Sequence, residues 1–163
     1  MLRLPKIITG IFFLTSVLTS FSVKAAGSVE MQVESIIRQS LQSYNTAMDT
    51  NQVDDWLKYF SDKVSRQSPL SEQSGKKEFT EFFNSEFKFF KAQYAVKQIL
   101  VNGRNAAVVL IWEAQHKASG DLFKVPMVAI FDMDTSGRFA SVNYYYDTGK
   151  LGKFAKDMSG PGN

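Results

Sequence analysis

Along this chain, stretches with helical spacing come first and alternating strands separated by tight turns come last, and this order constrains the fold more than any other feature. The spacing predicts helices at residues 30–49, from Asp54 and after Gly75. Strand patterns are found at residues 63–68, 94–101, 106–117, 122–132 and 139–147. Helices gathered before an antiparallel sheet are typical of an α+β fold. We therefore expect a curved antiparallel sheet wrapped round a long N-terminal helix, a shape that usually encloses a pocket.

Two of the helical stretches carry a continuous apolar face. In the first, apolar residues recur at three- and four-residue spacing, namely Val33, Ile36, Ile37, Leu41, Tyr44, Ala47 and Met48. In the third, the repeated residues are Phe79, Phe82, Phe83, Phe87 and Phe90. A stripe of this kind usually packs into the core, so we interpret the phenylalanines as core rather than as a cofactor site.

Glycine-containing turns set the register of the predicted strands. The turns are Asn102-Gly103, which is a typical hairpin dipeptide, Ser119-Gly120 as a two-residue turn, and residues 134–137 as a four-residue loop. This register places Trp112 opposite Met127, and Met127 opposite Tyr144. All three then share one face of the sheet, because side chains alternate between faces along a strand.

One face of the predicted sheet is apolar and is expected to meet the helices. Its members are Trp112, Ala114, His116, Val125, Met127, Ala129, Phe131, Ala140, Val142, Tyr144 and Tyr146. The opposite face carries Glu113, Gln115, Lys117, Lys124, Asn143, Tyr145 and Asp147. Small-molecule cavities are usually apolar and aromatic with few polar groups. We therefore expect a ligand pocket lined by Tyr44, Trp112, His116, Met127, Ala129, Phe131, Val142, Tyr144 and Tyr146.

The first 25 residues have the features of a secretory signal peptide of bacterial type. Arg3 and Lys6 precede a mostly apolar run at residues 7–18. Val23-Lys24-Ala25 has small residues at the two positions that signal peptidase recognises. The apolar run is shorter than the roughly 20 residues of a membrane span, and an uncleaved anchor is the alternative. We predict cleavage after Ala25, a periplasmic or secreted protein, and no stable membrane insertion after cleavage.

Composition argues against several classes of function. The chain has 19 basic and 16 acidic residues, and three of the basic ones lie in the predicted signal, so the remaining domain has 16 of each. This balance argues against a nucleic-acid partner, which requires a basic face. The absence of cysteine excludes disulfides, thiol chemistry and a lipoprotein anchor. With one histidine, no metal site is expected, and no cofactor is expected either.

Several segments resemble the nuclear transport factor 2-like superfamily, and within it the SnoaL-like and ketosteroid isomerase-like group. They are residues 44–49, residues 54–64, Gly75 and residues 137–147. The resemblance covers nearly all of the chain after the signal. It implies a cone-shaped, cystatin-like α+β domain with a deep cavity, here at residues 26–158 before a flexible tail at 159–163, and a homodimer through the outer sheet face.

The catalytic residues of this group are matched only in part. Related isomerases carry a base carboxylate before a proline where this chain has Ser68, and a second acid that holds the oxyanion where it has Ala129. Tyr44 matches a tyrosine on their first helix. SnoaL-like cyclases often carry an acid at the position of Tyr144, and Asp147 is expected on the outer face. Because serine is a poor base near neutral pH and alanine donates no hydrogen bond, isomerisation by that mechanism is not expected.

Three functions remain open, in a definite order of preference. The first is an exported, non-enzymatic domain that binds a small hydrophobic molecule. The second is a SnoaL-like enzyme of isomerase, cyclase or hydrolase type that uses His116, since histidine is the usual acid–base group near neutral pH, or Tyr44 and other tyrosines. The third is a periplasmic assembly or protein-interaction module whose interior is simply filled.

Overall fold

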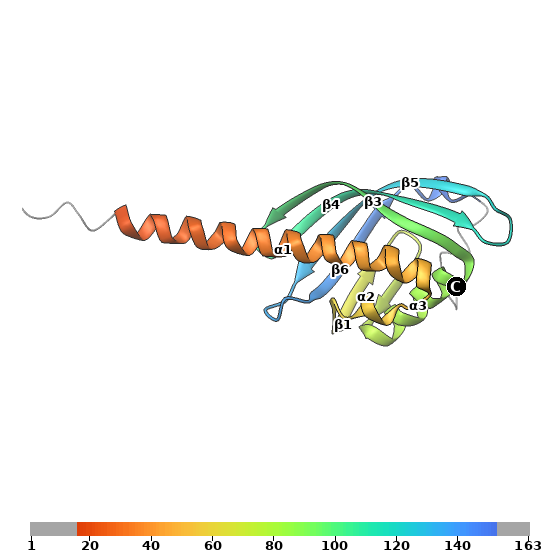
Figure 1. Ribbon diagram of the computed structural model, residues 1–163, viewed down its shortest axis with the longest axis horizontal. Helices are drawn as coiled ribbons and strands as arrows, with labels where there is room; N and C mark the ends of the chain where they lie inside the picture. Colours follow the sequence, from red (N-terminus) through yellow and green to blue (C-terminus); the bar gives the residue numbers. More distant parts are fainter. Residues whose placement is uncertain (1–15, 153–163) are drawn as a thin grey trace, which may run out of the picture.

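The computed structural model describes residues 16–152, with side chains from Gly27 onward. This part of the chain consists of helices packed against one six-stranded sheet (Figure 1). The helices are α1 (Ser16–Thr50), α2 (Asp54–Leu57) and α3 (Gly75–Phe89). The strands are β1 (Phe60–Gln67), β2 (Glu72–Ser74), β3 (Phe90–Asn102), β4 (Asn105–His116), β5 (Leu122–Met133) and β6 (Phe139–Tyr146), followed by the 3-10 turn η1 (Thr148–Lys150).

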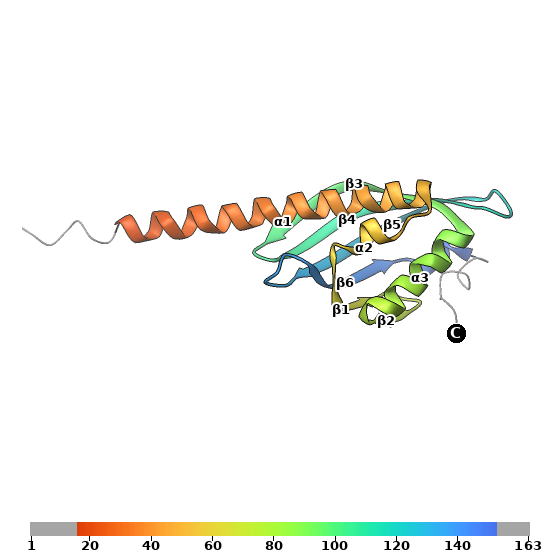
Figure 2. The same ribbon diagram turned by 60° about the horizontal axis from the view of Figure 1, so that its bottom comes forward.

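The sheet has the strand order β2-β1-β6-β5-β4-β3 and curves around α1 and α3 (Figures 1 and 2). This arrangement confirms the predicted α+β class and the sheet wrapped round a long helix. Two details differ from the prediction. The sheet is mixed, because β1 runs parallel to β6, and β2 lies between the strand expected at 63–68 and the helix expected after Gly75, where no strand was predicted. Turn residues reveal only hairpin neighbours, whereas the β1–β6 pair joins strands from opposite ends of the domain.

The predicted register is wrong by two residues in both hairpins. The backbone of His116 bonds to the carbonyl of Asp121, so the loop has four residues instead of two and Trp112 pairs with Val125. Between β5 and β6 a shorter loop and a bulge bring Met127 opposite Tyr146. A shift by an even number of residues leaves every side chain on its face, so the predicted apolar face does meet the helices. The bulge makes one exception, since Phe139 rather than Ala140 is buried.

The phenylalanine stripe of α3 is part of the core, as its spacing predicts. Phe79 and Phe83 are fully buried, and the Phe83 ring centroid lies 4.5 Å from that of Trp56 in an edge contact. Phe60 of β1 lies 4.5 Å from Phe79. Burying one phenylalanine side chain stabilises a fold by about 1.5–3 kcal/mol, so this stripe holds α3 firmly against the sheet.

The first helix is longer than predicted, and its first part projects past the sheet in Figure 1. Contact with the sheet is already made at Glu30, whose Oε1 accepts a hydrogen bond from the Gly103 backbone at 3.3 Å. The predicted cleavage point after Ala25 falls within α1, and cleavage stays a prediction. Residues 1–15 of the predicted signal and the predicted tail at 159–163 lie outside the described residues. Among residues 16–152, no helix is long and apolar enough to cross a membrane.

Candidate functional site

A small cavity lies in the interior of the cone, and one helix, five strands and the segment after η1 contribute to its wall. Its volume is about 20 Å³, which is room for roughly one water molecule. The lining residues are Arg66, Glu86, Tyr94, Trp112, Val125, Met127, Tyr144, Tyr146 and Leu151. The cavity therefore brings together β1, α3, all four long strands and the segment that follows η1.

Glu86 places a carboxyl group within the aromatic stripe of α3. It follows Phe79 by seven residues and Phe83 by three, so it lies on the same helical face, and it is 3% exposed. Burial raises the pKa of Glu86 above 4.5, while the hydrogen bond from Tyr44 and the charge of Arg66 oppose that rise. The sequence analysis missed this residue, although an acid at a core position of an aromatic stripe is a readable pattern.

Tyr44 and Trp112 complete a hydrogen-bonded chain that ends at Glu86. The Tyr44 hydroxyl donates to Glu86 Oε1, and the Trp112 indole Nε1 donates to the Tyr44 hydroxyl at 3.3 Å. The Tyr44 ring is fully buried and stacks on Tyr94 with centroids 4.2 Å apart. Burial, helped by the nearby Glu86, raises the pKa of Tyr44 well above 10.0. The hydroxyl is thus a proton donor at any physiological pH.

Arg66 is a second charged group in the interior, and the sequence analysis missed it as well. It alternates with Val64 on the buried side of β1 and is 4% exposed. Its Nη1 donates to Ser71 Oγ at 3.0 Å and to Gln73 Oε1 at 2.7 Å, and the guanidinium lies 3.9 Å from the centroid of the Phe82 ring. Its Nε has no hydrogen-bond partner among the residues that the structure describes.

Three tyrosines complete the polar part of the lining. Burial raises the pKa of Tyr144 to about 12 and the pKa of Tyr94 well above 10.0, so both hydroxyls stay protonated. The pKa of Tyr146 is also raised by burial, and the nearby Ser68 and Arg66 oppose that rise. Within the described part of the chain, however, no group has the geometry of a hydrogen bond to the buried Tyr146 hydroxyl.

The pocket residues expected from sequence fall into two groups around this cavity. Trp112, Met127, Tyr144 and Tyr146 line it. Ala129, Phe131 and Val142 are buried on the same side of the sheet without being part of the lining, and Tyr44 lies one hydrogen bond away behind Glu86. The structure adds Arg66, Glu86, Tyr94, Val125 and Leu151 to the expected set.

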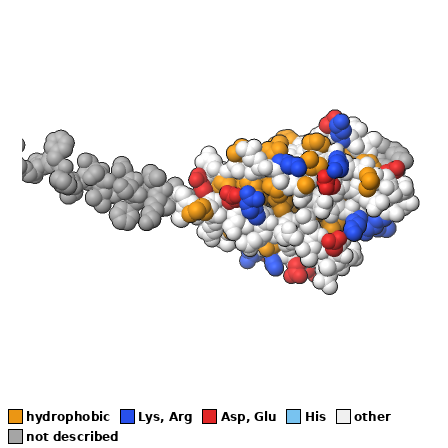
Figure 3. All heavy atoms as spheres, turned by 45° about the horizontal axis from the view of Figure 1, so that its top comes forward, with side chains coloured by type: hydrophobic (Ala, Val, Ile, Leu, Met, Phe, Trp, Pro, Cys, Tyr) orange, Lys and Arg blue, Asp and Glu red, His pale blue; other side chains and the backbone are white. Residues whose placement is uncertain are grey.

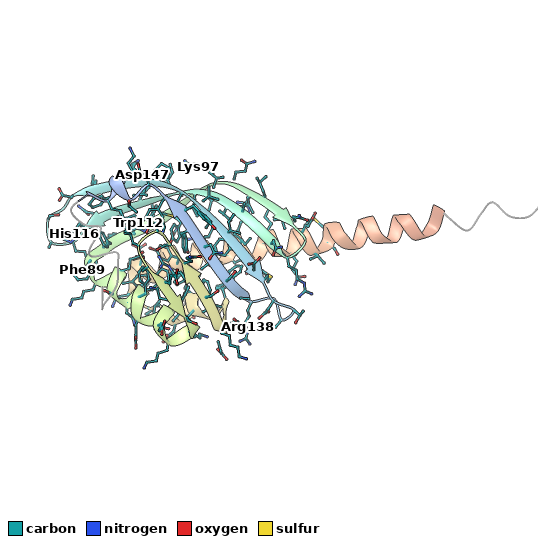
Figure 4. All side chains as sticks on the ribbon, turned by 180° about the vertical axis from the view of Figure 1, so that it is seen from behind. Phe89, Lys97, Trp112, His116, Arg138 and Asp147 are labelled. Atoms are coloured by element: carbon teal, nitrogen blue, oxygen red, sulfur yellow. The ribbon has the colours of Figure 1, made fainter. Side chains whose placement is uncertain are left out.

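His116 lies apart from this group, at the end of β4. Its Nδ1 accepts a hydrogen bond from the Ser119 backbone at 3.3 Å, and its ring makes an edge contact with Phe90 at 5.4 Å. Figure 4 shows it at the end of the sheet near Phe89, beyond Trp112. Asp147 is exposed, as expected, and its Oδ1 accepts from the Gly149 backbone at 2.9 Å at the start of η1.

The interior can therefore bind a polar group and hold a proton. A carboxyl, a guanidinium and several hydroxyls converge on one cavity from distant parts of the chain, and the rest of the wall is apolar. No cluster of three or more metal-ligating side chains occurs among the described residues. Convergent polar groups in an otherwise apolar interior are the usual arrangement of a small-molecule site.

Known proteins share this architecture. The profile of the SnoaL-like domain matches residues 41–142, well over half of the chain. A protein from Jannaschia sp. CCS1 described as a SnoaL-like polyketide cyclase superposes with a TM-score of 0.67 at 17% identity, over 82% of this chain and 96% of that one. SalBIII, an epoxide hydrolase/cyclase-like enzyme of pyran ring formation in salinomycin, gives 0.66 at 16% identity, over 74% and 95%. No curated protein matches the chain significantly.

A third solved structure has the same fold. It is a protein from Rhodopseudomonas palustris described as an isomerase, with a TM-score of 0.61 at 13% identity over 68% of this chain and 87% of that one. At such low identities the structural likeness shows the fold alone, whereas the sequence profile runs from the last part of α1 to the middle of β6 and includes six of the nine cavity-lining residues. The chain belongs to the SnoaL-like domain family, within the nuclear transport factor 2-like superfamily.

Proposed function

We propose that this SnoaL-like domain binds a small, largely hydrophobic molecule in the interior of its cone, with the polar end of the molecule at Arg66 and Glu86. The observation that carries the proposal is that both side chains are almost completely buried and line one cavity. A scaffold gains little from such groups, because well-packed hydrocarbon side chains of similar volume are often equally or more stabilising in a core. Charged groups kept at a cavity are better explained by a ligand.

The proposal does not use the carboxylates of the related isomerases. Ser68 is part of a turn, in which its hydroxyl accepts a hydrogen bond from the Ser71 backbone at 3.2 Å. Ala129 is fully buried opposite Tyr144. Neither side chain can abstract a proton near pH 7, so binding is the first expectation for the interior.

We propose that the ligand enters the cavity beside Leu151. Leu151, in the segment after η1, is 2% exposed and closes one part of the wall. A volume of about 20 Å³ admits a head group but no larger body. We therefore propose that the body of the ligand takes the place of the Leu151 side chain, so that binding moves this segment.

The test is native mass spectrometry of the protein purified from its natural compartment, followed by organic extraction and identification of what co-purifies. We expect a small molecule that Arg66→Gln loses. The matched control is Arg138→Gln, because Arg138 is exposed just before β6, and this variant should retain the ligand. A protein that is always empty, and that no member of a small-molecule library stabilises against heat, would contradict the proposal.

A second candidate is acid–base catalysis in the same cavity, with Glu86 as the proton-transfer group. It is favoured by the raised pKa of this buried carboxyl and by the proton donor Tyr44 beside it, since such tuning is typical of catalytic acids and bases. With the ligand identified, turnover would be followed by mass spectrometry. Glu86→Gln should abolish turnover while His116→Ala keeps it, and turnover that survives Glu86→Gln would exclude this role.

We also propose that two copies associate through the outer face of the sheet. Val109, Val128 and Tyr145 are cross-strand neighbours in one row, and Val109 and Tyr145 are 37% and 58% exposed. Figure 3 brings the β3–β5 side of the molecule forward and shows hydrophobic side chains between charged ones. Light scattering should give a dimer that Val109→Lys dissociates and Met31→Lys, at an exposed position of α1, does not. A wild-type monomer at high concentration would contradict this arrangement.

Export is a further part of the proposal and rests on the N-terminal sequence. The basic residues, the apolar run and the small residues before Ala26 support a signal peptide. Cell fractionation should find the protein in the periplasm or the medium, and N-terminal sequencing should begin at Ala26. A full-length protein that remains with the membrane would support the uncleaved anchor instead.

A further inference from the structure

Building on the proposed binding function, we propose that the polar end of the ligand is a carboxylate, held by the Nε–H of Arg66 and the hydroxyl of Tyr146. Both residues line the same cavity, and in the described structure neither of these two buried groups has a hydrogen-bond partner. Buried polar groups without partners are rare in folded proteins. In the proposed complex, a carboxylate oxygen of the ligand accepts hydrogen bonds from the Arg66 Nε–H and from the Tyr146 hydroxyl.

The remaining contacts of Arg66 favour an anion over a neutral acceptor. Its hydrogen bonds go to Ser71 Oγ and Gln73 Oε1, which are both uncharged. Its guanidinium plane rests on Phe82 and lies 5.2 Å from the ring centroid of Tyr144. None of these contacts neutralises the charge. A guanidinium donates two parallel hydrogen bonds best to a carboxylate, so a carboxylate ligand satisfies the charge and the free Nε–H together.

Glu86 shares the cavity but is directed to a different partner. Its Oε1 accepts the hydrogen bond from Tyr44, and burial favours its protonated form by raising its pKa. The charge of Arg66 lowers that pKa again, so Arg66 is the charged group of the lining only while Glu86 holds its proton. A neutral Glu86 does not repel a ligand carboxylate bound at Arg66. The presence of one acid in the cavity wall is therefore compatible with a carboxylate ligand.

The size of the cavity restricts the rest of the molecule. About 20 Å³ holds a carboxylate oxygen, and the neighbouring wall is formed by Met127, Val125 and Leu151. A body that passes this wall has to be apolar. The structure therefore assigns the ligand to the apolar monocarboxylic acids, such as short fatty or aryl acids.

The experiment compares two acids with their matched amides, hexanoate with hexanamide and benzoate with benzamide, on the isotope-labelled mature protein. The readout is the Arg66 Nε–H resonance in a nitrogen-edited proton spectrum, and only Arg38, Arg104 and Arg138 add similar resonances after the signal. We expect the acids to shift the Arg66 resonance, and the amides to bind at least about tenfold more weakly, the factor for one hydrogen bond to a charged group.

Tyr146→Phe tests the second donor at little expected cost to the fold, because no described group has the geometry of a hydrogen bond to its hydroxyl and only Ser68 lies close enough to affect its pKa in that way. We expect roughly tenfold weaker hexanoate binding and a smaller loss for hexanamide, because its neutral carbonyl oxygen accepts a weaker hydrogen bond than a carboxylate oxygen does. The matched control is Tyr145→Phe, on the opposite face of the same strand, which should change neither. Equal binding of acids and amides would overturn the carboxylate and leave the binding function standing. If neither class bound and the Arg66 resonance stayed fixed, the carboxylate proposal would fall, whereas the binding function is decided by the co-purification and heat-stabilisation tests described above.

Discussion

The hydrogen-bonded chain from Trp112 through Tyr44 to Glu86 predicts a measurable coupling between two residues of the core. Tyr44→Phe removes one hydroxyl and keeps the ring that stacks on Tyr94. The loss leaves the Trp112 Nε1–H without its acceptor and the Glu86 carboxyl without its donor, and both groups stay buried. The perturbation is therefore confined to hydrogen bonding.

The expected magnitude follows from those two orphaned groups. An unsatisfied buried donor or acceptor costs about 1–3 kcal/mol, so Tyr44→Phe should lower the free energy of unfolding by about 2–6 kcal/mol. Glu86→Leu orphans the Tyr44 hydroxyl but removes a buried carboxyl. In the double variant both the Tyr44 hydroxyl and the Glu86 carboxyl are absent, so neither remains as a buried group without its hydrogen-bond partner. The double variant should then lose less stability than the sum of the two single variants, by about 0.5–3 kcal/mol, the usual range for residues in one polar network.

The assay is urea unfolding of the four proteins at pH 7, followed by tryptophan fluorescence and by circular dichroism. The control is Tyr145→Phe, which removes the hydroxyl of a tyrosine that is 58% exposed and should change stability by less than about 0.5 kcal/mol. Additivity within about 0.5 kcal/mol would show that the Tyr44–Glu86 contact contributes nothing, and the reasoning about the interior would be refuted.

Three further predictions concern separate parts of the molecule. Burial raises the pKa of Glu86 above its unfolded value of 4.5, so the folded state binds the proton more tightly and stability falls as pH rises from about 4.5 through the folded pKa; unfolding curves across this window should show the fall in the wild type and not in Glu86→Gln. His116→Ala should cost about 1 kcal/mol through its lost bond at the turn and leave ligand affinity unchanged by calorimetry, and a loss of binding would place His116 in the site after all. Gly137 has φ of +79° with open space around its Cβ position, so Gly137→Ala should lower stability by about 1–2 kcal/mol through backbone strain alone, and Gly137→Asn by less; equal stability of all three proteins by thermal unfolding would contradict a strained turn.

The sheet was readable from sequence because its information is local. Gly103, Gly120 and Gly137 all have positive φ and sit in the turns that the sequence indicates. Period-two alternation then assigned the buried face correctly even though both registers were wrong by two residues. Loop length and the bulge beside Phe139 depend on backbone hydrogen bonds that residue types do not specify, and this is why the register was missed while the faces were not.

The polar interior could not be predicted in the same way. Hydrophobic spacing assigns positions to a core but treats a charged residue there as an interruption, so Glu86 and Arg66 were passed over. The groups that stabilise these buried charges are distant in the sequence. Tyr44, for example, precedes its hydrogen-bond partner Glu86 by 42 residues. The expected site was apolar for this reason, and the predicted acid–base residue, His116, was chosen for its chemistry rather than its place. Acids and arginines within an otherwise apolar stripe are the pattern to look for.

The position of β6 has a consequence for when the domain can fold. This strand comes last in the chain but lies inside the sheet, between β1 and β5. Until it emerges during synthesis, β1 and β2 have no neighbour that connects them to β5, β4 and β3. Contacts of such large sequence separation also form slowly. A nascent chain of this topology therefore completes its sheet only when nearly its full length is available.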